Sequence, residues 1–395
     1  MTTTAAPLQD LINDSYFQLF NDAPLLVRSP GRVNLIGEHT DYNNGLVLPA
    51  AIDKNIIVAI GKRDDDVINL RSLDQDQAHT ASLGALQRSP MLWPDYILGV
   101  VDQLSKRGHA LKGFNLVFGG DIPQGAGLSS SAALECATAY ALNELFALGL
   151  QRLDIALIGQ AAENEFVGVK CGLMDQFASV FGKEQHLIKL DCADFSHEYI
   201  PFNNPDLRIV LFDTQVKHSL ASSAYNERRQ QCEYGVALIQ KSNPAVTSLR
   251  DATLEELDHY IKPIDETVYR RCHYVVSEIQ RLHKACDHLK NNDFKSFGKL
   301  MFETHDGLQH QYEVSCEELD ILVDTVRHEE NVLGARMMGG GFGGCTINLI
   351  KADQVHEVVE HVSAVYARKT GKTVQAYIAN ISEGTSTIRI TKRTD

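Results

Sequence analysis

The sequence predicts a protein of mixed helices and strands in two domains. Its 395 residues exceed the usual length of one domain, and a hydrophobic fraction of 44% is enough for a substantial core. Residues 113–118 alternate small or polar side chains with apolar ones, which is typical of a strand. Residues 132–148 contain no glycine or proline and are rich in Ala, Leu and Glu, which favours a helix ending at Gly149.

The loop between these two elements is rich in glycine and serine and is a candidate anion site. Its glycines allow backbone N–H groups to converge on phosphate oxygens, and the helix that follows adds the partial positive charge of its N-terminus. Its serine hydroxyls can bind phosphate or ligate magnesium. From the loop alone, an ordinary turn capped by Ser129 is an equally good interpretation. The candidate phosphate-binding residues are Gly125, Ala126, Gly127, Leu128, Ser129, Ser130 and Ser131.

Two other nucleotide-binding motifs do not fit this loop. A P-loop ends in Gly-Lys-Ser/Thr, and no lysine occurs between Lys112 and Lys170. A dinucleotide-binding loop needs a third glycine or alanine where Ser130 stands. Glu144 lies at the right distance for the ribose-binding acid of that motif, but it falls inside the predicted helix. An NAD-dependent oxidoreductase is therefore not supported.

Composition narrows the class of partner and the compartment. A net charge of −14 and a pI of about 5.5 argue against nucleic acid as the main partner. The eight cysteines form no Cys-x-x-Cys pair, which favours a reducing compartment over a disulfide framework or a zinc site. The N-terminus lacks the features of a signal peptide, and no apolar run approaches the length of about 18 residues that spans a bilayer. We expect a cytoplasmic protein that contacts no membrane.

The N-terminal third contains further predicted elements. Residues 8–20 space their apolar positions for an amphipathic helix. Residues 46–60 are β-rich with a break at Pro49, and residues 64–66, three aspartates, fit a solvated turn. Residues 93–106 are expected to form a helix, which we interpret as structural.

A polar cluster follows the first predicted strand. Glu38, His39 and Asp41 lie within four residues, between Gly37 and an Asn-Asn-Gly turn. Carboxylates accept hydrogen bonds from vicinal hydroxyls and histidine can donate or accept, so the cluster suits a polyol. Arg32 on the strand adds a permanent cation that can pair with a carboxylate or phosphate. A charged hairpin whose residues only satisfy one another is the alternative.

Two carboxylates lie beyond the central helix. Residues 155–165 are predicted to be helical and carry Glu163 and Glu165. Asp175 comes shortly after Gly172, near the start of a new helical segment. It can stabilise the helix N-terminus, or it can stand beside the glycine so that a substrate approaches closely. Taken alone, the residues of this stretch favour a role for Asp175 in stabilising the helix N-terminus.

The C-terminal half is mainly helical with a few strands. Tyr225 lies near the start of one predicted helix, and a glycine-rich stretch over residues 338–344 lies between apolar residues, which indicates close backbone approach to another loop or a ligand. Two short strands are expected at the end of the chain. The other predicted elements are strands at residues 186–191, 207–213 and 346–350 and helices at residues 219–239, much of 244–330, and 355–370.

Three motifs in this order resemble those of the GHMP small-molecule kinases. They are GRVNLIGEHTDY at residues 31–42, PQGAGLSSSAA at residues 123–133 and MGGGFGG at residues 338–344. The first resembles the signature of the galactokinase family in particular. The resemblance runs from about Ser29 to the C-terminus, and no motif departs from the pattern in a way that removes a functional residue.

This resemblance implies a fold and an activity. The implied fold class is α+β, a two-domain GHMP kinase architecture with an S5-like N-terminal domain at residues 1–205 and a ferredoxin-like C-terminal domain at residues 206–395. The implied activity transfers the γ-phosphoryl group of ATP, with Mg²⁺, to the C1 hydroxyl of α-D-galactose, the first committed step of galactose catabolism. We expect D-galactose and MgATP as the binding partners of a monomeric protein.

The resemblance also implies roles for single residues. Asp175 resembles the catalytic base, and Arg32 the cation beside it. Whether Asp175 abstracts the proton early or only orients the hydroxyl is left open. The loop at residues 125–131 resembles the triphosphate loop, and Ser131 and Glu163 resemble the magnesium ligands. The implied sugar contacts are Glu38, His39, Thr40, Asp41, Gly172 and Tyr225.

Two rival functions share the implied fold. A non-catalytic galactose sensor is disfavoured because the serine loop is complete and Asp175 is present. A kinase for another acceptor is the second rival. The cluster at residues 38–41 favours a hexose over mevalonate or homoserine, whereas an N-acetylated hexose needs pocket room that the sequence does not display.

Overall fold

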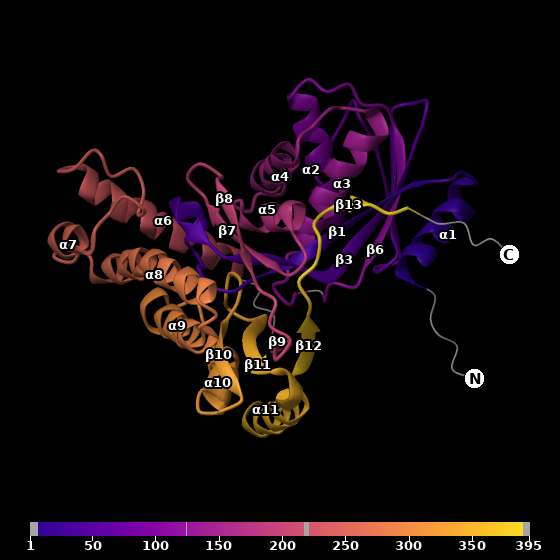
Figure 1. Cartoon of the computed structure of the whole chain (residues 1–395). Coiled ribbons are helices and arrows are strands. Elements are labelled where there is room, and N and C mark those ends of the chain that lie inside the picture. Colours follow the sequence, from indigo (N-terminus) through magenta and orange to yellow (C-terminus); the bar gives the residue numbers. More distant parts are fainter. Residues whose placement is uncertain (1–6, 124, 217–220, 390–395) are drawn as a thin grey trace.

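The computed structural model describes residues 7–123, 125–216 and 221–389, with side chains at 221–223 left out. Within these ranges the chain forms three sheets (Figure 1). The largest has six strands, and all its neighbouring pairs are antiparallel except β4 with β6. Its strands, in spatial order, are β13 (Ser386–Thr387), β1 (Leu25–Asn34), β3 (Pro49–Lys62), β6 (Phe114–Gly120), β4 (Val67–Ser72) and β5 (Gln77–Ser82).

Helices cover both faces of this sheet (Figure 1). On one face, Leu26, Ile57 and Val117 pack with Ile12 and Tyr16 of α1 (Leu8–Phe20). Because successive side chains of a strand point to opposite faces, the neighbouring positions pack into the main core on the other face. The helices on that side are α2 (Trp93–Lys106), α3 (Ser130–Phe146), α4 (Arg152–Ala161) and α5 (Met174–Phe181).

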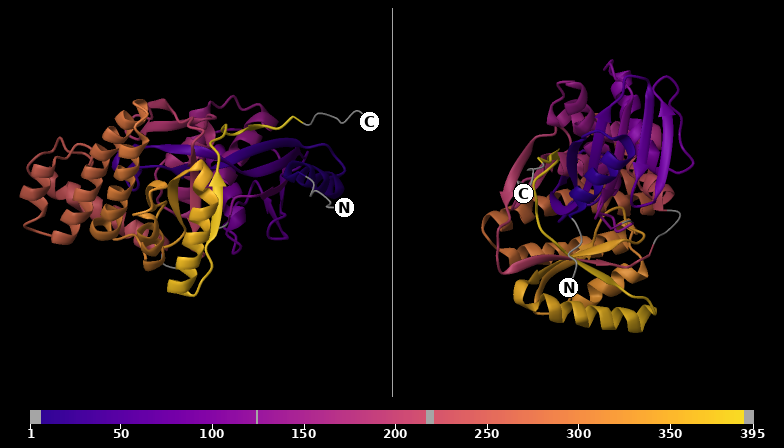
Figure 2. Two further views of the ribbon diagram at one scale, coloured as in Figure 1. Left: turned by 60° about the horizontal axis from the view of Figure 1, so that its bottom comes forward. Right: turned by 90° about the vertical axis from the view of Figure 1, so that its right-hand side faces the viewer.

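The second sheet is antiparallel and joins the first through a shared core. Its strand order is β10 (Val332–Met337), β11 (Cys345–Lys351), β9 (Leu207–Asp213), β12 (Gln375–Ala379). Leu211 and Ile347 belong to the main core, whereas Val210 and Phe212 face α10 (Glu317–Val326) and α11 (Val355–Thr370). The yellow helix α11 runs along the outer face of this sheet (Figure 2). The two sheets therefore share one core, and loops from both sheets lie at their junction.

A helical unit and a small sheet complete the described chain. The small sheet contains β2 (Leu46–Val47), β7 (His186–Asp191) and β8 (His197–Pro201). Side chains of the helical unit form a separate core cluster around Tyr274 and Tyr312. Its helices are α6 (Ala221–Gln240), α7 (Leu254–Glu256), α8 (Glu266–Lys290) and α9 (Phe294–Gly307), the last followed by a π-helical segment, η4 (Leu308–Tyr312).

Most predicted elements are confirmed, including the break before Pro49 and the two short final strands. The helix predicted at residues 155–165 begins earlier and passes into a π-helix, η2 (Ala162–Val167), which carries Glu163. The helix predicted at residues 219–239 is described from Ala221, and its first two predicted residues lie outside the described ranges. Strands β4, β5, β8 and β10 were not predicted.

The last described strand lies in the same sheet as the first. The predicted domain boundary at residue 205 falls between β8 and β9, and it stays a prediction. Strand β13 then pairs with β1, and Asn380 bonds to Asp53 on β3, so the C-terminal segment fastens the two parts together. Among the described residues, every helix is too short or too polar to cross a membrane.

Candidate functional site

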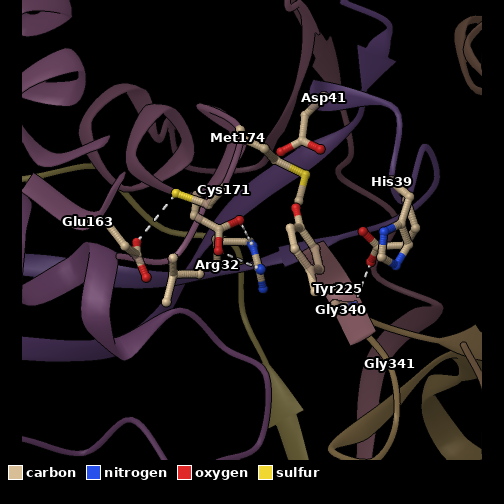
Figure 3. Close-up of a pocket in the computed structure, with 14 residues that line it drawn as sticks. Arg32, His39, Asp41, Glu163, Cys171, Met174, Tyr225, Gly340 and Gly341 are labelled. Carbon is tan, nitrogen blue, oxygen red and sulfur yellow. Dashed lines mark hydrogen bonds and ion pairs between the residues drawn. The ribbon is translucent and has the colours of Figure 1, made fainter. Parts of the chain in front are cut away.

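The three sequence motifs meet at the junction of the two sheets. Arg32 donates through Nη1 to the carbonyl of Gly127 at 2.6 Å, and the backbone N–H of Gly339 donates to Glu38 at 2.7 Å. A cavity of about 300 Å³ opens between them (Figure 3). It is lined by Arg32, Glu38, His39, Asp41, Glu163, Val169, Cys171, Gly172, Met174, Asp175, Tyr225, Gly339, Gly340 and Gly341.

Arg32 and Asp175, which both line this cavity, form an ion pair. Arg32 donates through Nε and Nη2 to the two carboxylate oxygens of Asp175, at 2.7 and 2.8 Å. Ser129 Oγ donates to the same carboxylate at 2.5 Å. Burial lowers the pKa of Arg32, but the charges of Asp175 and Glu38 raise it above its ordinary value. Asp175 is therefore held in one orientation by a permanent cation and a hydroxyl.

Asp41 lies against Gly172, and this contact explains the glycine. A Cβ at residue 172 would lie 2.1 Å from Asp41 Oδ2, so a larger residue would displace the carboxyl group. Burial, and then the charge of Asp175, raise the pKa of Asp41 to about 7. Asp175 is thus firmly paired, whereas the pKa of the neighbouring Asp41 is raised toward neutrality.

The raised pKa of Asp41 predicts a pH-dependent cost to stability. The folded state binds this proton more tightly than the unfolded state, so the penalty is absent below pH 4, grows as pH rises, and is complete above pH 7. We expect Asp41→Asn to have a higher free energy of unfolding than the native protein, and this advantage should be about 2 kcal/mol larger at pH 8 than at pH 4. The value is half of the free energy that corresponds to the full pKa shift, because the Asp41 side chain is partly solvated. Urea denaturation of both proteins at the two pH values checks this, and an equal difference at both would contradict it.

Glu38 is held by the protein on both oxygens. Oε1 accepts from Arg336 and from the N–H of Gly339, and Oε2 accepts from Asn34 at 3.0 Å. Arg336 is fully buried and also donates to the carbonyls of Leu35, Asn34 and Met337. Glu38 therefore joins the first motif to the third, in addition to lining the cavity.

Thr40 supports the loop that carries these residues. Its hydroxyl lies 2.9 Å from the carbonyl of Gly37 and 2.6 Å from that of Leu46. The N–H of Gly37 donates to Glu278 of α8 at 2.8 Å. The loop is thus held by the hydroxyl of its own Thr40 and by Glu278 of the helical unit.

His39 and Tyr225 form an aromatic wall of the cavity (Figure 3). Their ring centroids lie 5.4 Å apart, and His39 is 4% exposed. Burial and the nearby charges of Arg228 and Arg336 lower the pKa of His39 to about 4, so its ring is neutral at pH 7. Tyr225 also packs on Gly340 of the third motif.

The glycine-serine loop lines a second cavity of about 270 Å³. Gly125 and Gly127 have φ of 79° and 74°, the left-handed region that glycine adopts without strain. Ser130 begins α3, so the loop and the helix N-terminus face the cavity together. The two cavities share Arg32, Asp175, Gly339 and Gly340 in their linings.

A third cavity of about 310 Å³ adjoins the same loop. Trp93 and Tyr96 of α2 line it together with Ser130 and Ser131. The interpretation of this helix as only structural is therefore incomplete. An aromatic residue at the start of a predicted helix was the only signal available, and it does not distinguish a cavity wall from a core.

Glu163 lines the first cavity, close to Ser131 of the glycine-serine loop. Gln176 Nε2 donates to it at 3.0 Å, and Ser131 and Cys171 also hydrogen-bond to it. Burial, and then the charge of Asp175, raise the pKa of Glu163 to about 7. The described residues contain no group of three or more His, Cys, Asp or Glu side chains that could enclose a metal ion. One carboxylate and one hydroxyl suit Mg²⁺ that also binds phosphate, because Mg²⁺ keeps few protein ligands in such sites.

Family models match three parts of the chain. They are described as the galactokinase galactose-binding signature at residues 14–62, the GHMP kinases N terminal domain at residues 95–183 and GHMP kinases C terminal at residues 282–368. A galactokinase of Clostridium acetobutylicum is 42% identical over 91% of this chain and 94% of its own. One of Roseiflexus is 40% identical over 91% and 92%, and one of Thermotoga maritima 40% identical over 92% and 99%. The chain belongs to the galactokinase family.

Solved structures agree with this membership. Lactococcus lactis galactokinase complexed with galactose superposes with a TM-score of 0.93 at 34% identity, covering 97% of this chain and all of that one. Mevalonate kinase of Methanococcus jannaschii, at 18% identity and a TM-score of 0.63, shares the fold. The expected two-domain GHMP kinase architecture is confirmed.

In this galactokinase-family chain, the predicted site residues line the cavities at the junction, except Thr40 and Ala126, which are buried and line none of them. Sequence reasoning missed Arg336, Glu278 and Tyr312, which anchor the site from the C-terminal half. Arg336 could have been identified from the sequence, since it is the single charged residue in the apolar and glycine-rich stretch at 331–344. Such a residue indicates a buried partner.

Proposed function

We propose that the chain is a galactokinase, which transfers the γ-phosphoryl group of ATP to the C1 hydroxyl of α-D-galactose and releases ADP. The observation that carries this proposal is the position of the Arg32–Asp175 pair, which lines both the cavity with the polar cluster and the cavity of the glycine-serine loop. An acceptor hydroxyl on one side and a phosphoryl group on the other would meet at this pair.

Asp175 and Arg32 divide the work of the transfer. Phosphoryl transfer depends mainly on positioning the acceptor oxygen in line and on neutralising charge. Asp175 accepts a hydrogen bond from the C1 hydroxyl and takes its proton as the new O–P bond forms. Arg32 and Ser129 hold the carboxylate in place, and Arg32 adds positive charge beside the γ-phosphate. The bidentate pair holds both carboxylate oxygens of Asp175 in a fixed position beside the acceptor hydroxyl.

The remaining contacts, those of ATP, Mg²⁺ and the sugar, are assigned to the loop residues, the aromatic cavity and the other polar residues of the site. Amides of residues 125–131 bind the triphosphate, and the aromatic cavity of Trp93 and Tyr96 receives the nucleoside. Ser131 and Glu163 would hold Mg²⁺, which neutralises phosphate charge when it is bound. Asp41, His39 and Tyr225 contact sugar hydroxyls, with Gly172 leaving room for Asp41.

Glu163→Gln is expected to weaken the response to magnesium selectively. It removes the charge of one proposed ligand and keeps the shape of the side chain, so the Mg²⁺ concentration for half-maximal rate should rise about tenfold or more. Titration of the rate, and Mn²⁺ binding by electron paramagnetic resonance with ADP present, measure this. Glu165→Gln is the matched control, because Glu165 lies on the same π-helix and is 53% exposed. An equal loss in both variants would argue against the assignment.

The test of the function is ADP release from MgATP with D-galactose, D-glucose or N-acetyl-D-galactosamine offered separately, with the phosphate position of the product identified. Turnover with galactose to the 1-phosphate supports the proposal. Turnover with another sugar would retain the catalytic assignments and replace the substrate. Binding of galactose and ATP without turnover would instead indicate a sensor.

A further inference from the structure

A chain of hydrogen bonds runs from His39 into the helical unit. His39 Nδ1 lies 2.7 Å from the hydroxyl of Tyr42, which lies 2.7 Å from the hydroxyl of Tyr312. The hydroxyl of Tyr312 lies 3.3 Å from Sγ of Cys232 on α6. These residues come from three distant parts of the sequence, and Tyr312 and Cys232 are almost fully buried.

The direction of the hydrogen bonds along this chain is set at its outer end, at His39. At the inner end, the side-chain amide of Asn43 hydrogen-bonds to the Cys232 thiol and donates to the carbonyl of His39 at 2.9 Å. The thiol sulfur can accept from both Asn43 and Tyr312, or donate to Tyr312, so this end accommodates either direction.

The outer end selects one direction. His39 Nε2 is buried, has no well-formed hydrogen bond among the described residues, and approaches the backbone of Gly340 at the cavity wall (Figure 3). The nearby polar group is an acceptor, so Nε2 carries the hydrogen. A neutral imidazole has only one N–H, and Nδ1 is therefore the acceptor for Tyr42. Because each hydroxyl has a single hydrogen, Tyr42 then accepts from Tyr312, and Tyr312 accepts from Cys232.

We propose that Tyr42 and Tyr312 are positioning residues, which hold His39 as the Nε2–H tautomer so that it presents one hydrogen-bond donor to a hydroxyl oxygen of the sugar. The identity of the ligand rests on the proposed function, whereas the tautomer does not. The low pKa of His39 is consistent with this role, because a ring that stays neutral keeps its single donor in one place. The backbone of His39 has a φ of 63°, a strained conformation for a non-glycine residue that the surrounding contacts must maintain.

The direct test is ¹⁵N NMR of histidine-labelled protein at pH 8, without substrate. The protonated and bare nitrogens of a neutral ring have well-separated shifts, and His39→Gln identifies the signal of His39. We expect hydrogen on Nε2 in the native protein, a mixture of tautomers in Tyr42→Phe, and a smaller change in Tyr312→Phe. Hydrogen on Nδ1 in the native protein, or an unchanged tautomer in Tyr42→Phe, would overturn the proposal.

Kinetics separate positioning from packing. Phenylalanine keeps the rings in place, so Tyr42→Phe should raise KM for galactose about tenfold, the effect of one impaired hydrogen bond, and leave kcat and KM for ATP nearly unchanged. Tyr366→Phe is the matched control, since Tyr366 is fully buried, lines neither cavity, and donates from its hydroxyl to the carbonyl of Thr214. A parallel loss in both kinetic constants and in KM for ATP would assign Tyr42 a packing role. If the native protein does not phosphorylate galactose, the proposed function fails, while the NMR result still decides the tautomer.

Discussion

Asp175→Asn should reduce kcat by about 10²–10⁴-fold, the usual contribution of a general base, while ATP affinity stays nearly intact. The amide keeps the shape of the carboxylate but cannot take the hydroxyl proton. It also loses one of the two charge-assisted bonds from Arg32. Rates of ADP release and calorimetric titration with a non-hydrolysable ATP analogue measure the two quantities.

The control for Asp175→Asn is Asp191→Asn. Asp191 accepts a similar two-pronged ion pair from Arg250, at 2.7 and 2.6 Å, away from the cavities. Loss of that pair should leave kcat unchanged. If Asp175→Asn lost ATP binding and folded structure together with turnover, Asp175 would be a structural residue and the proposed mechanism would be wrong.

Arg336→Met is expected to lower the free energy of unfolding by about 3–5 kcal/mol, because it leaves the carboxylate of Glu38 buried without a counter-charge. Adding Glu38→Gln should recover part of this loss, since the remaining N–H donor of Gly339 can bond to a neutral amide. Chemical denaturation of the two single variants and the double variant gives the coupling between the residues.

Arg63→Met is the control for that cycle. Arg63 pairs with Asp65 at 2.6 Å, but both side chains are partly exposed, at 28% and 48%. Its removal should cost no more than about 1 kcal/mol. If the losses in free energy of unfolding of the Glu38 and Arg336 single variants add up to that of the double variant, the two residues stabilise the fold independently.

Much of the site was predictable because its motifs are local. Glycines at left-handed positions, serines before a helix and a polar cluster between a strand and a turn are recognisable within about ten residues, since local geometry demands those residue types. The π-helix that carries Glu163 was not predictable in this way. Its start resembles an ordinary helix, and the change at Ala162 has no distinct composition.

Most helices and strands, the glycine-serine loop and the candidate site residues Arg32 and Asp175 could be recognised from the sequence, whereas strands β4, β5, β8 and β10 could not. The sequence did not reveal which distant groups meet in the fold. Arg336 reaches Glu38 from 298 positions away, Asp41 occupies the space that Gly172 leaves, and Tyr312 completes the hydrogen bonds of Tyr42. A buried polar group must find its partner wherever the fold supplies one, and the residues near it in the sequence do not say where that is.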